Sequence, residues 1–292
     1  MSSWIHQPPS IPITMRISHN TPNGEQAYPH EVPQFGLGVF LMPANGECKN
    51  SILTALDAGY THIDTARAYN NEHEVGQAIK ESGVDRESLF ITTKLRRGHA
   101  TGYEEVLHHC QESLRLLDMD YIDLYLVHAP HENIDHRAPV WKGMEYCLEQ
   151  GWVKSIGVSN YGPAHLEAMK TYANYMPSVN QVEFNPWLQR PHLVKATEDA
   201  GAKIMAYSPL ARGHKVDDPE LAAIAEKLGC TPAQVAIKFC YDSGCITIPK
   251  SSKPERIVEN LASLEVDISS QIDAIRGLEC NYVSGWDPTT ED

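Results

Sequence analysis

Short apolar segments alternate with amphipathic segments along most of this 292-residue chain. The apolar segments resemble β-strands, begin roughly 25 to 40 residues apart, and cover Phe35–Phe40, Thr61–Asp64, Leu89–Lys94, Tyr121–His128, Val153–Gly157, Ser178–Phe184, Lys203–Ser208 and Cys245–Pro249. Between them, apolar residues recur three and four positions apart, which is the period of a helix with one buried face. The alternation predicts eight parallel strands connected by helices.

The helices are predicted from this period and from the residues at their ends. The predicted helical stretches are Ser51–Ala58, Tyr103–Leu117, Val140–Glu149, Ala164–Thr171, Pro219–Leu228 and Pro232–Asp242. Asp218 and Thr231 each precede a proline, as expected for an N-cap residue before the first helical position. Thr231 and Gln234 also have capping-box spacing. Glycines that we expect to end helices are Gly59, Gly83, Gly151, Gly201, Gly229 and Gly244.

Two architectures contain such an alternation. A doubly wound dinucleotide fold carries G-x-G-x-x-G after its first strand, but here Gly36-Leu37-Gly38 is followed by Leu41. Eight strands favour a closed (β/α)₈ TIM barrel of the α/β class, built as a single domain. We assign residues 35–292 to the barrel and residues 1–34 to an N-terminal extension. Asn23-Gly24 predicts a hairpin in this extension that caps one end of the barrel.

Composition narrows the class of protein. Hydrophobic residues make up 42% of the chain, which is ordinary for a globular protein. The formal net charge of −14 argues against binding to nucleic acid. No apolar run is long enough for a membrane span, and the N-terminus has no secretory signal pattern. Seven cysteines without a CxxC motif predict reduced thiols in a cytoplasmic protein. The histidines at 128, 131 and 136 fit no standard zinc spacing, so we predict no metal site.

Polar side chains stand at the ends of three consecutive predicted strands. Asp64, Lys94 and His128 close their segments, and Tyr69 follows Asp64 by five residues. In a barrel the carboxyl ends of the strands carry the chemistry, so these groups should meet there. An ammonium beside a tyrosine favours the tyrosinate and lowers its pKa from about 10. Such a site suits proton donation to an oxygen that becomes an alkoxide, as in carbonyl reduction, which also needs a hydride source.

The segment from Gly59 to Glu72, GYTHIDTARAYNNE, resembles the signature of the aldo-keto reductase superfamily. The similarity continues through roughly residues 36–262 in several motifs. These are ITTK ending at Lys94, YLVH ending at His128, SIGVSN at 155–160, NQVEFNP at 180–186, AYSPL at 206–210 and IPKSS at 248–252. The resemblance independently implies a (β/α)₈ barrel that uses NADPH without a Rossmann fold.

The resemblance also implies roles for individual residues. Tyr69 would be the proton donor, Lys94 and Asp64 would tune it, and His128 would orient the substrate carbonyl. The remaining implied contacts are to the cofactor. Ser159, Asn160 and Gln181 would hold the nicotinamide carboxamide, Tyr207 would stack on the nicotinamide ring, and Ser208 and Leu210 would line the pyrophosphate path.

A basic cluster within the acidic chain marks a second candidate site. Lys250, Lys253 and Arg256 fall within seven positions, and Pro254 predicts the start of a helix there. Backbone N–H groups, hydroxyls and a guanidinium at a helix start form a good phosphate site. By the resemblance, Lys250, Ser251, Ser252 and Arg256 would bind the 2′-phosphate of NADPH, and Glu259 and Asn260 would reach the adenine. This predicts NADPH over NADH.

Two positions depart from the superfamily pattern. Arg96 stands where many relatives have Trp, and Ala129 stands where an aromatic residue is common. Both positions usually border the substrate pocket, so we consider Phe40, Trp187 and Trp286 as alternative apolar walls or as core residues. A further hypothesis is that Arg96 attracts an acidic or polar substrate.

The leading function is therefore an NADPH-dependent reductase of a small-molecule aldehyde or ketone. A regulatory subunit that binds the cofactor with little turnover is an alternative of a different class. An aldolase or isomerase with Lys94 as a Schiff-base nucleophile is a third possibility. We expect a monomer or a weak homodimer.

Overall fold

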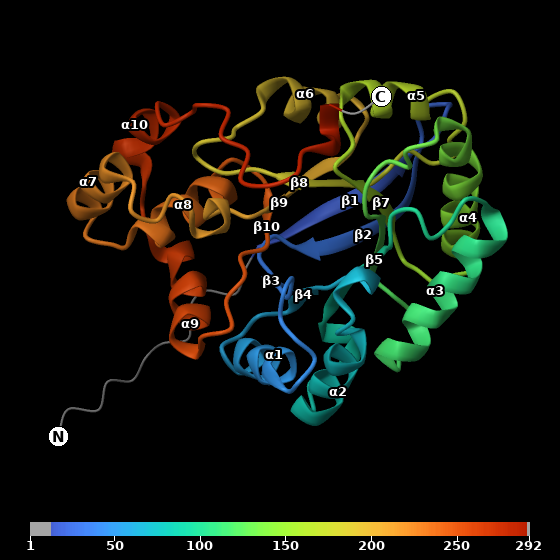
Figure 1. Cartoon of the computed structure of the whole chain (residues 1–292), viewed down its shortest axis with the longest axis horizontal. Helices are drawn as coiled ribbons and strands as arrows, with labels where there is room; N and C mark the ends of the chain where they lie inside the picture. The colour runs from blue at the N-terminus through green and yellow to red at the C-terminus, as the bar shows by residue number, and fades with distance from the viewer. Residues whose placement is uncertain (1–12, 291–292) are drawn as a thin grey trace.

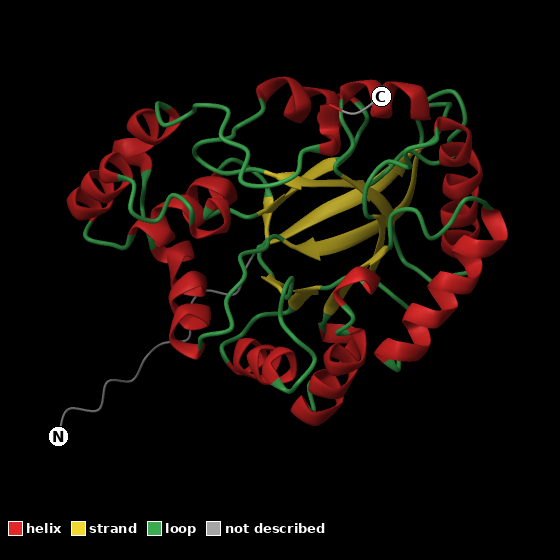
Figure 2. Ribbon diagram, in the orientation of Figure 1, coloured by secondary structure: helices red, strands yellow, loops and turns green. Residues whose placement is uncertain are grey.

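The computed structural model describes residues 13–290 and contains a barrel of eight parallel strands surrounded by helices (Figures 1 and 2). The strands are β3 (Leu37–Gly38), β4 (His62–Asp64), β5 (Phe90–Leu95), β6 (Leu124–Val127), β7 (Ile156–Ser159), β8 (Val179–Glu183), β9 (Lys203–Tyr207) and β10 (Ile246–Thr247). They are hydrogen-bonded in chain order from β3 to β10. Phe35, just before β3, pairs in parallel with Thr247 of β10 and closes the barrel. The predicted (β/α)₈ fold is confirmed.

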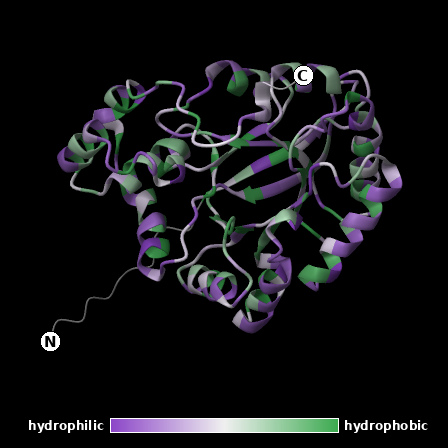
Figure 3. Cartoon of the chain, viewed as in Figure 1, coloured by the Kyte–Doolittle hydropathy of each residue, from purple (hydrophilic) through white to green (hydrophobic). Residues whose placement is uncertain are grey.

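The helices pack outside the strands. They are α1 (Glu47–Asp57), α2 (Glu72–Ser82), α3 (Tyr103–Leu117), α4 (Arg137–Glu149), α5 (Pro163–Met169), α6 (Pro191–Asp199), α7 (Pro219–Leu228), α8 (Pro232–Asp242), α9 (Pro254–Ala262) and α10 (Ile272–Arg276). In Figure 3 hydrophobic residues gather on the strands, and hydrophilic residues mark the outer faces of the helices. No helix within residues 13–290 is both long enough and apolar enough to cross a membrane.

The end signals read from the sequence are confirmed. The Asp218 carboxylate accepts hydrogen bonds from the first backbone N–H groups of α7, and Thr231 forms a capping box with Gln234 at the start of α8. Gly83 and Gly229 end α2 and α7 in the left-handed conformation that glycine adopts without strain. Helices α3, α7 and α8 have the predicted bounds, whereas α2 and α6 were not predicted from the sequence.

Several observed strands are shorter than predicted, and one is shifted along the chain. The predicted strand at 153–157 is instead β7 at 156–159, and Val153 makes only an isolated bridge with Ile122. Gly157 was taken as the last residue of that strand, but it lies inside β7. A Cβ at Gly157 would come within 2.6 Å of the Val179 carbonyl oxygen, so the close approach of β7 to β8 requires glycine.

The predicted hairpin is present and precedes the barrel strands in the chain. Strands β1 (Thr14–Asn20) and β2 (Gln26–Pro33) are antiparallel, and their turn contains Asn23-Gly24 (Figure 1). Residues 1–12 of the predicted extension lie outside the described part of the chain, and its boundary at residue 34 stays a prediction.

Hairpin side chains pack against the amino ends of the barrel strands. Ile17 and Val32 are buried with Phe90 and Leu124, which begin β5 and β6. His19 is fully buried, donates from Nδ1 to the Met176 carbonyl at 2.8 Å, and accepts from the Ser155 hydroxyl at 3.2 Å. The hairpin therefore covers the amino end of the barrel, and the carboxyl end stays open.

Candidate active site

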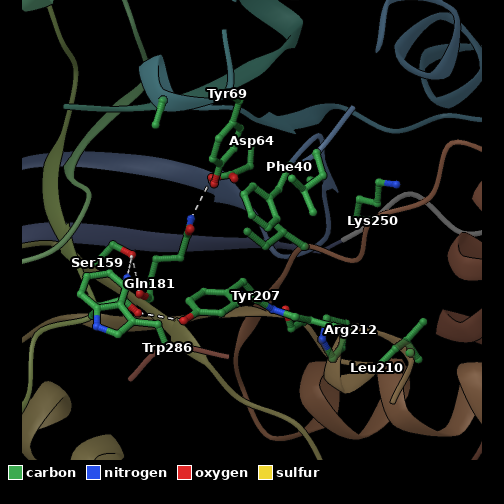
Figure 4. A pocket seen from close by; sticks show the side chains of 18 of the residues that line it. Phe40, Asp64, Tyr69, Ser159, Gln181, Tyr207, Leu210, Arg212, Lys250 and Trp286 are labelled. Atoms are coloured by element: carbon green, nitrogen blue, oxygen red, sulfur yellow. Dashed lines mark hydrogen bonds between the residues drawn. The ribbon is translucent and has the colours of Figure 1, made fainter. Parts of the chain in front are cut away.

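A pocket of about 600 Å³ opens at the carboxyl end of the barrel (Figure 4). Most of the side chains expected to contact substrate or cofactor line it. These are Asp64, Tyr69, His128, Ser159, Asn160, Gln181, Tyr207, Ser208, Leu210, Lys250 and Arg256. The fold thus brings together residues that are up to about 190 positions apart in the chain.

A buried ion pair lies beneath the end of the pocket that holds Tyr69. Lys94 Nζ is 2.6 Å from Asp64 Oδ1 and donates a second hydrogen bond to the Thr65 carbonyl at 2.7 Å. The other oxygen of Asp64 accepts from the Gln181 amide at 2.8 Å. Lys94 is fully buried and does not line the pocket, whereas Asp64 does. Strands β4 and β5 are adjacent and parallel, so residues at their carboxyl ends meet as predicted.

Tyr69 stands above this pair in the short 3₁₀ helix η1 (Arg67–Tyr69). Its ring centroid lies 5.2 Å from Lys94 Nζ and 5.6 Å from the His128 ring. Phe40, from the loop after β3, packs on it at 5.0 Å. No role for Asn71 was predicted from the sequence, although its side chain holds the loop after β4 in place.

Asn71 is fully buried just beyond the helix that carries Tyr69. Its side-chain amide donates to the carbonyls of Val39 and Met42 at 3.1 Å, and its oxygen accepts from the Thr65 hydroxyl at 2.7 Å. These bonds tie the loop after β4 to the loop after β3. Asn71 thereby helps to place Tyr69 against Phe40.

The pKa of Tyr69 shifts in the direction opposite to the one predicted from the sequence. Burial raises the pKa of Tyr69 well above 10, and the negative charge of Asp64 adds to the rise. The expected lowering of the Tyr69 pKa by Lys94 was wrong, because burial of Tyr69 dominates and the Lys94 ammonium is paired with Asp64 at 2.6 Å. Burial also lowers the pKa of Lys94, with Asp64 opposing the change. The pKa of His128 falls to about 3 through burial and the Lys94 charge, so His128 is a neutral imidazole.

A hydrogen-bonded polar floor continues from His128 along the pocket. The Asn160 amide donates to the His128 carbonyl at 3.0 Å, and the Tyr207 hydroxyl donates to the Asn160 side-chain oxygen at 2.9 Å. The Ser159 hydroxyl donates to the Gln181 carbonyl at 2.8 Å. Figure 4 shows Tyr207, Gln181 and Ser159 on one side of the pocket. Ser159 and Tyr207 end β7 and β9, and Gln181 lies in the middle of β8 between them.

The basic cluster lies at the far end of the same pocket. Lys250 and Arg256 line it, and α9 begins at Pro254 as predicted. Four of the predicted cofactor residues do not line the pocket, and these are Ser251, Ser252, Glu259 and Asn260. The Glu259 carboxylate is bonded to the Thr231 hydroxyl at 2.7 Å.

The structure corrects the expected pocket walls. Trp187 is 1% exposed and belongs to the core, where its indole N–H donates to Asp218. Arg96 is exposed on the loop after β5 and does not line the main pocket, so it is not placed to attract a substrate there. Phe40 and Trp286 do line it.

Further lining residues were not anticipated. Leu41 and Val216 come from loops, and Arg212 comes from the short 3₁₀ helix η4 (Ala211–Gly213). The Arg212 guanidinium lies 5.8 Å from the centre of the Phe40 ring. It also packs against Gly285, where an added Cβ would lie within 3 Å of the guanidinium. No local pattern in the sequence marks these three residues.

Comparisons with known proteins agree with this geometry. The aldo/keto reductase family model matches residues 44–279. The glyoxal reductase of Bacillus subtilis is 41% identical over 88% of this chain and 93% of its own length. The methylglyoxal reductase DkgA of Escherichia coli is 43% identical over 78% of this chain and 82% of its own. A crystal structure of a Gox0644 variant in complex with NADPH superimposes with a TM-score of 0.85, at 35% identity over 96% of this chain and 99% of that one. The chain thus belongs to the aldo/keto reductase family and is an oxidoreductase of that family.

Proposed function

We propose that this protein reduces an aldehyde or ketone to an alcohol with NADPH, and that Tyr69 donates the proton to the carbonyl oxygen. The supporting observation is the position of Tyr69 in the pocket, between the neutral His128 ring at 5.6 Å and the Lys94–Asp64 pair. Proton donation requires a group that still carries its proton at neutral pH. The raised pKa keeps the proton on Tyr69 before the reaction but makes Tyr69 a weaker acid, so the transfer depends on Lys94 to stabilise the tyrosinate.

The neighbours of Tyr69 have distinct parts in this proposal. His128, as a neutral imidazole, donates an N–H to the substrate oxygen and orients the carbonyl. Lys94 stabilises negative charge that develops on the Tyr69 oxygen after the proton leaves. Asp64 keeps the Lys94 ammonium charged and fixed, despite the burial that lowers the lysine pKa.

The pocket residues fit NADPH, which when bound supplies the hydride for the carbonyl carbon. Ser159, Asn160 and Gln181 would hold the carboxamide, and the Tyr207 ring would stack on the nicotinamide. Ser208 and Leu210 would follow the pyrophosphate. The NADPH complex of the Gox0644 variant, with the same fold, supports this assignment.

The far end of the pocket supports NADPH over NADH. Lys250 and Arg256 are exposed there, and within residues 13–290 neither forms an ion pair with a carboxylate. Their charges are therefore available for the 2′-phosphate. Ser251 and Ser252 remain proposed phosphate contacts, and Glu259 and Asn260 remain proposed adenine contacts.

The relatives indicate a substrate class. Proteins 41% and 43% identical to this chain carry the names glyoxal reductase and methylglyoxal reductase. Small reactive aldehydes and dicarbonyls are therefore the first substrates to test. A Schiff-base role for Lys94 is disfavoured, because its Nζ is buried and already donates to Asp64 and Thr65.

The experiment follows the hydride itself. The protein is incubated with NADPH deuterated at C4 and a panel of aldehydes and ketones, and the product alcohol is analysed by mass spectrometry. We expect one deuterium on the carbinol carbon. Tight NADPH binding without turnover on any carbonyl would contradict the proposal and favour the regulatory alternative.

A further inference from the structure

Trp286 forms one wall of the pocket, although it lies near the end of the chain. It is 50% exposed and reaches the pocket beside Ser159 and Tyr207 (Figure 4). The Arg97 guanidinium carbon lies 4.4 Å from the centroid of the Trp286 ring. This distance is within the range of a cation–π contact, which holds an aromatic ring in one orientation.

Arg97 is itself fixed by a third loop. Its Nε donates to the Pro130 carbonyl at 3.1 Å, two residues beyond His128, and its Nη2 lies 3.6 Å from Glu132. Arg97 therefore connects the loop after β5, the loop after β6 and the C-terminal segment 279–290. A change in the orientation of the guanidinium would therefore change its contact with the Trp286 ring.

The backbone on both sides of Trp286 is anchored separately. The Ser284 N–H donates to the buried Glu183 carboxylate at 3.1 Å, and Asp287 pairs with Arg190 at 3.1 Å. These bonds set where the C-terminal segment crosses the barrel. They do not fix the orientation of the indole ring, which depends on the side-chain contacts of Trp286, including the one with Arg97.

The two positions expected to supply aromatic walls do not supply them. Arg96 does not line the main pocket, and Ala129 is a small buried residue that does not line it either. Beyond Tyr69 and Tyr207, the aromatic surface of the pocket comes from Phe40 and Trp286. Trp286 thus replaces walls that this chain lacks.

We infer that Arg97 is a positioning residue for substrate specificity, because it holds Trp286 as the wall that contacts the part of the substrate beyond the carbonyl. The carbonyl substrates that benefit carry an aromatic or extended apolar group. This inference rests on the proposed function. A small dicarbonyl such as methylglyoxal has no group that reaches Trp286, so its reduction does not depend on the ring.

The effect is on binding and not on chemistry. Arg97 contacts Trp286 and Pro130, whereas the pair beneath Tyr69 is formed by Lys94 and Asp64. Losing the cation–π contact should raise KM for an aryl aldehyde by about three- to tenfold. The kcat for that substrate should stay within about twofold, because uniform binding is lost and transition-state contacts are kept.

The test compares adjacent arginines with steady-state kinetics. Arg97→Ala, Arg96→Ala as the matched control, Arg97→Lys and Trp286→Ala are assayed with NADPH on benzaldehyde and on methylglyoxal. We expect Arg97→Ala to raise KM for benzaldehyde alone, Arg96→Ala to behave as wild type, and Arg97→Lys to recover part of the loss. In the Trp286→Ala background, Arg97→Ala should have no further effect on KM.

Three results would overturn the inference. Equal KM changes for Arg96→Ala and Arg97→Ala would show a general effect of surface charge. A parallel rise for benzaldehyde and methylglyoxal would show a general disturbance of the pocket, as would additive losses in the double variant. If the wild-type protein reduces no carbonyl at all, the proposed function itself fails. If the wild-type protein reduces both substrates but the Arg97 variants give one of the three results above, only the inference about Arg97 fails.

Discussion

The two ends of the barrel use similar residues for different purposes. At the amino end, buried His19 ties the β1–β2 hairpin to Met176 and Ser155. At the carboxyl end, His128 faces an open pocket beside Tyr69. Burial lowers the pKa of both histidines, to about 4 for His19 and about 3 for His128. Both are neutral at physiological pH, yet only the second can reach a small molecule.

The difference lies in what surrounds each group. The amino end is filled by apolar side chains of the hairpin and the strands, including Ile17 and Val32, and every ring nitrogen of His19 has a protein partner. The carboxyl end carries a strained backbone, with positive φ at Asn160 and Ser208, and exposed apolar side chains such as Leu41. We therefore expect chemistry at the carboxyl end alone, whereas groups at both ends contribute to stability. Variants at the amino end should lose stability and keep kcat per folded molecule.

The largest effect on this comparison is expected at Lys94. Replacing Lys94 with Met should lower kcat by at least about 10²-fold, because charge on the Tyr69 oxygen is no longer stabilised. It should also cost about 3–5 kcal/mol in unfolding free energy, since Asp64 is left as an uncompensated buried carboxylate. The double variant Lys94→Met/Asp64→Asn serves as control. It should regain most of the stability and none of the activity, and a recovered kcat would contradict the role of the pair.

At the amino end the expected loss is in stability alone. His19→Ala should lower the unfolding free energy by about 2–4 kcal/mol, because it opens a cavity and leaves buried partners unsatisfied. Denaturant unfolding measures the change, and kcat per folded molecule should equal that of wild type. His30→Ala, on the same hairpin but partly exposed, should cost less. A large fall in kcat for the His19 variant would show that the two ends are not separate.

Acid should destabilise the protein through buried histidines at both ends of the barrel, because burial lowers the pKa of His128 at the carboxyl end as well. His19 and His62 have pKa values near 4, lowered from 6.5 by burial, so the folded state disfavours their charged forms. Their contribution is complete above pH 6.5 and is lost as the pH falls from 6.5 towards 4. The loss is up to about 3 kcal/mol for each group. Unfolding curves between pH 8 and 4 measure this, and a flat profile from pH 6.5 to 4.5 would contradict it.

The smallest predicted effect is on cofactor binding by Arg256, at the end of the pocket farthest from Tyr69. Arg256→Ala should raise KM for NADPH by about tenfold and leave KM for NADH nearly unchanged, because a charge-assisted phosphate contact is worth about 1.5–3 kcal/mol. Lys253→Ala is the matched control, since Lys253 belongs to the same cluster but does not line the pocket. An equal change for both cofactors would remove Arg256 from phosphate recognition.

Much of the barrel could be predicted because its signals are local. The capping residues Asp218 and Thr231 and the strand-end positions of Asp64 and Lys94 are each encoded within a few residues. Helix α2 was not named, although its buried Val75, Ala78 and Ile79 have helical spacing.

The remaining features depend on contacts that one chain segment cannot reveal. Arg96 and Arg97 are neighbours in sequence, yet only Arg97 reaches Trp286, almost 190 residues away. The direction of the Tyr69 pKa was wrong because the sequence gives a lysine nearby but not the degree of burial or the pairing of that lysine. The walls of the pocket and the balance of charge inside it are therefore properties of the fold.

The central claim is that Tyr69 supplies the proton in carbonyl reduction. It is tested most directly by Tyr69→Phe, which removes one oxygen and keeps the ring contacts with Phe40 and His128. The measurement combines kcat on a reactive aldehyde with the Kd for NADPH from calorimetry. We predict a fall in kcat of about 10²- to 10⁴-fold with an unchanged Kd. A Tyr69→Phe variant that retains wild-type kcat would contradict the claim.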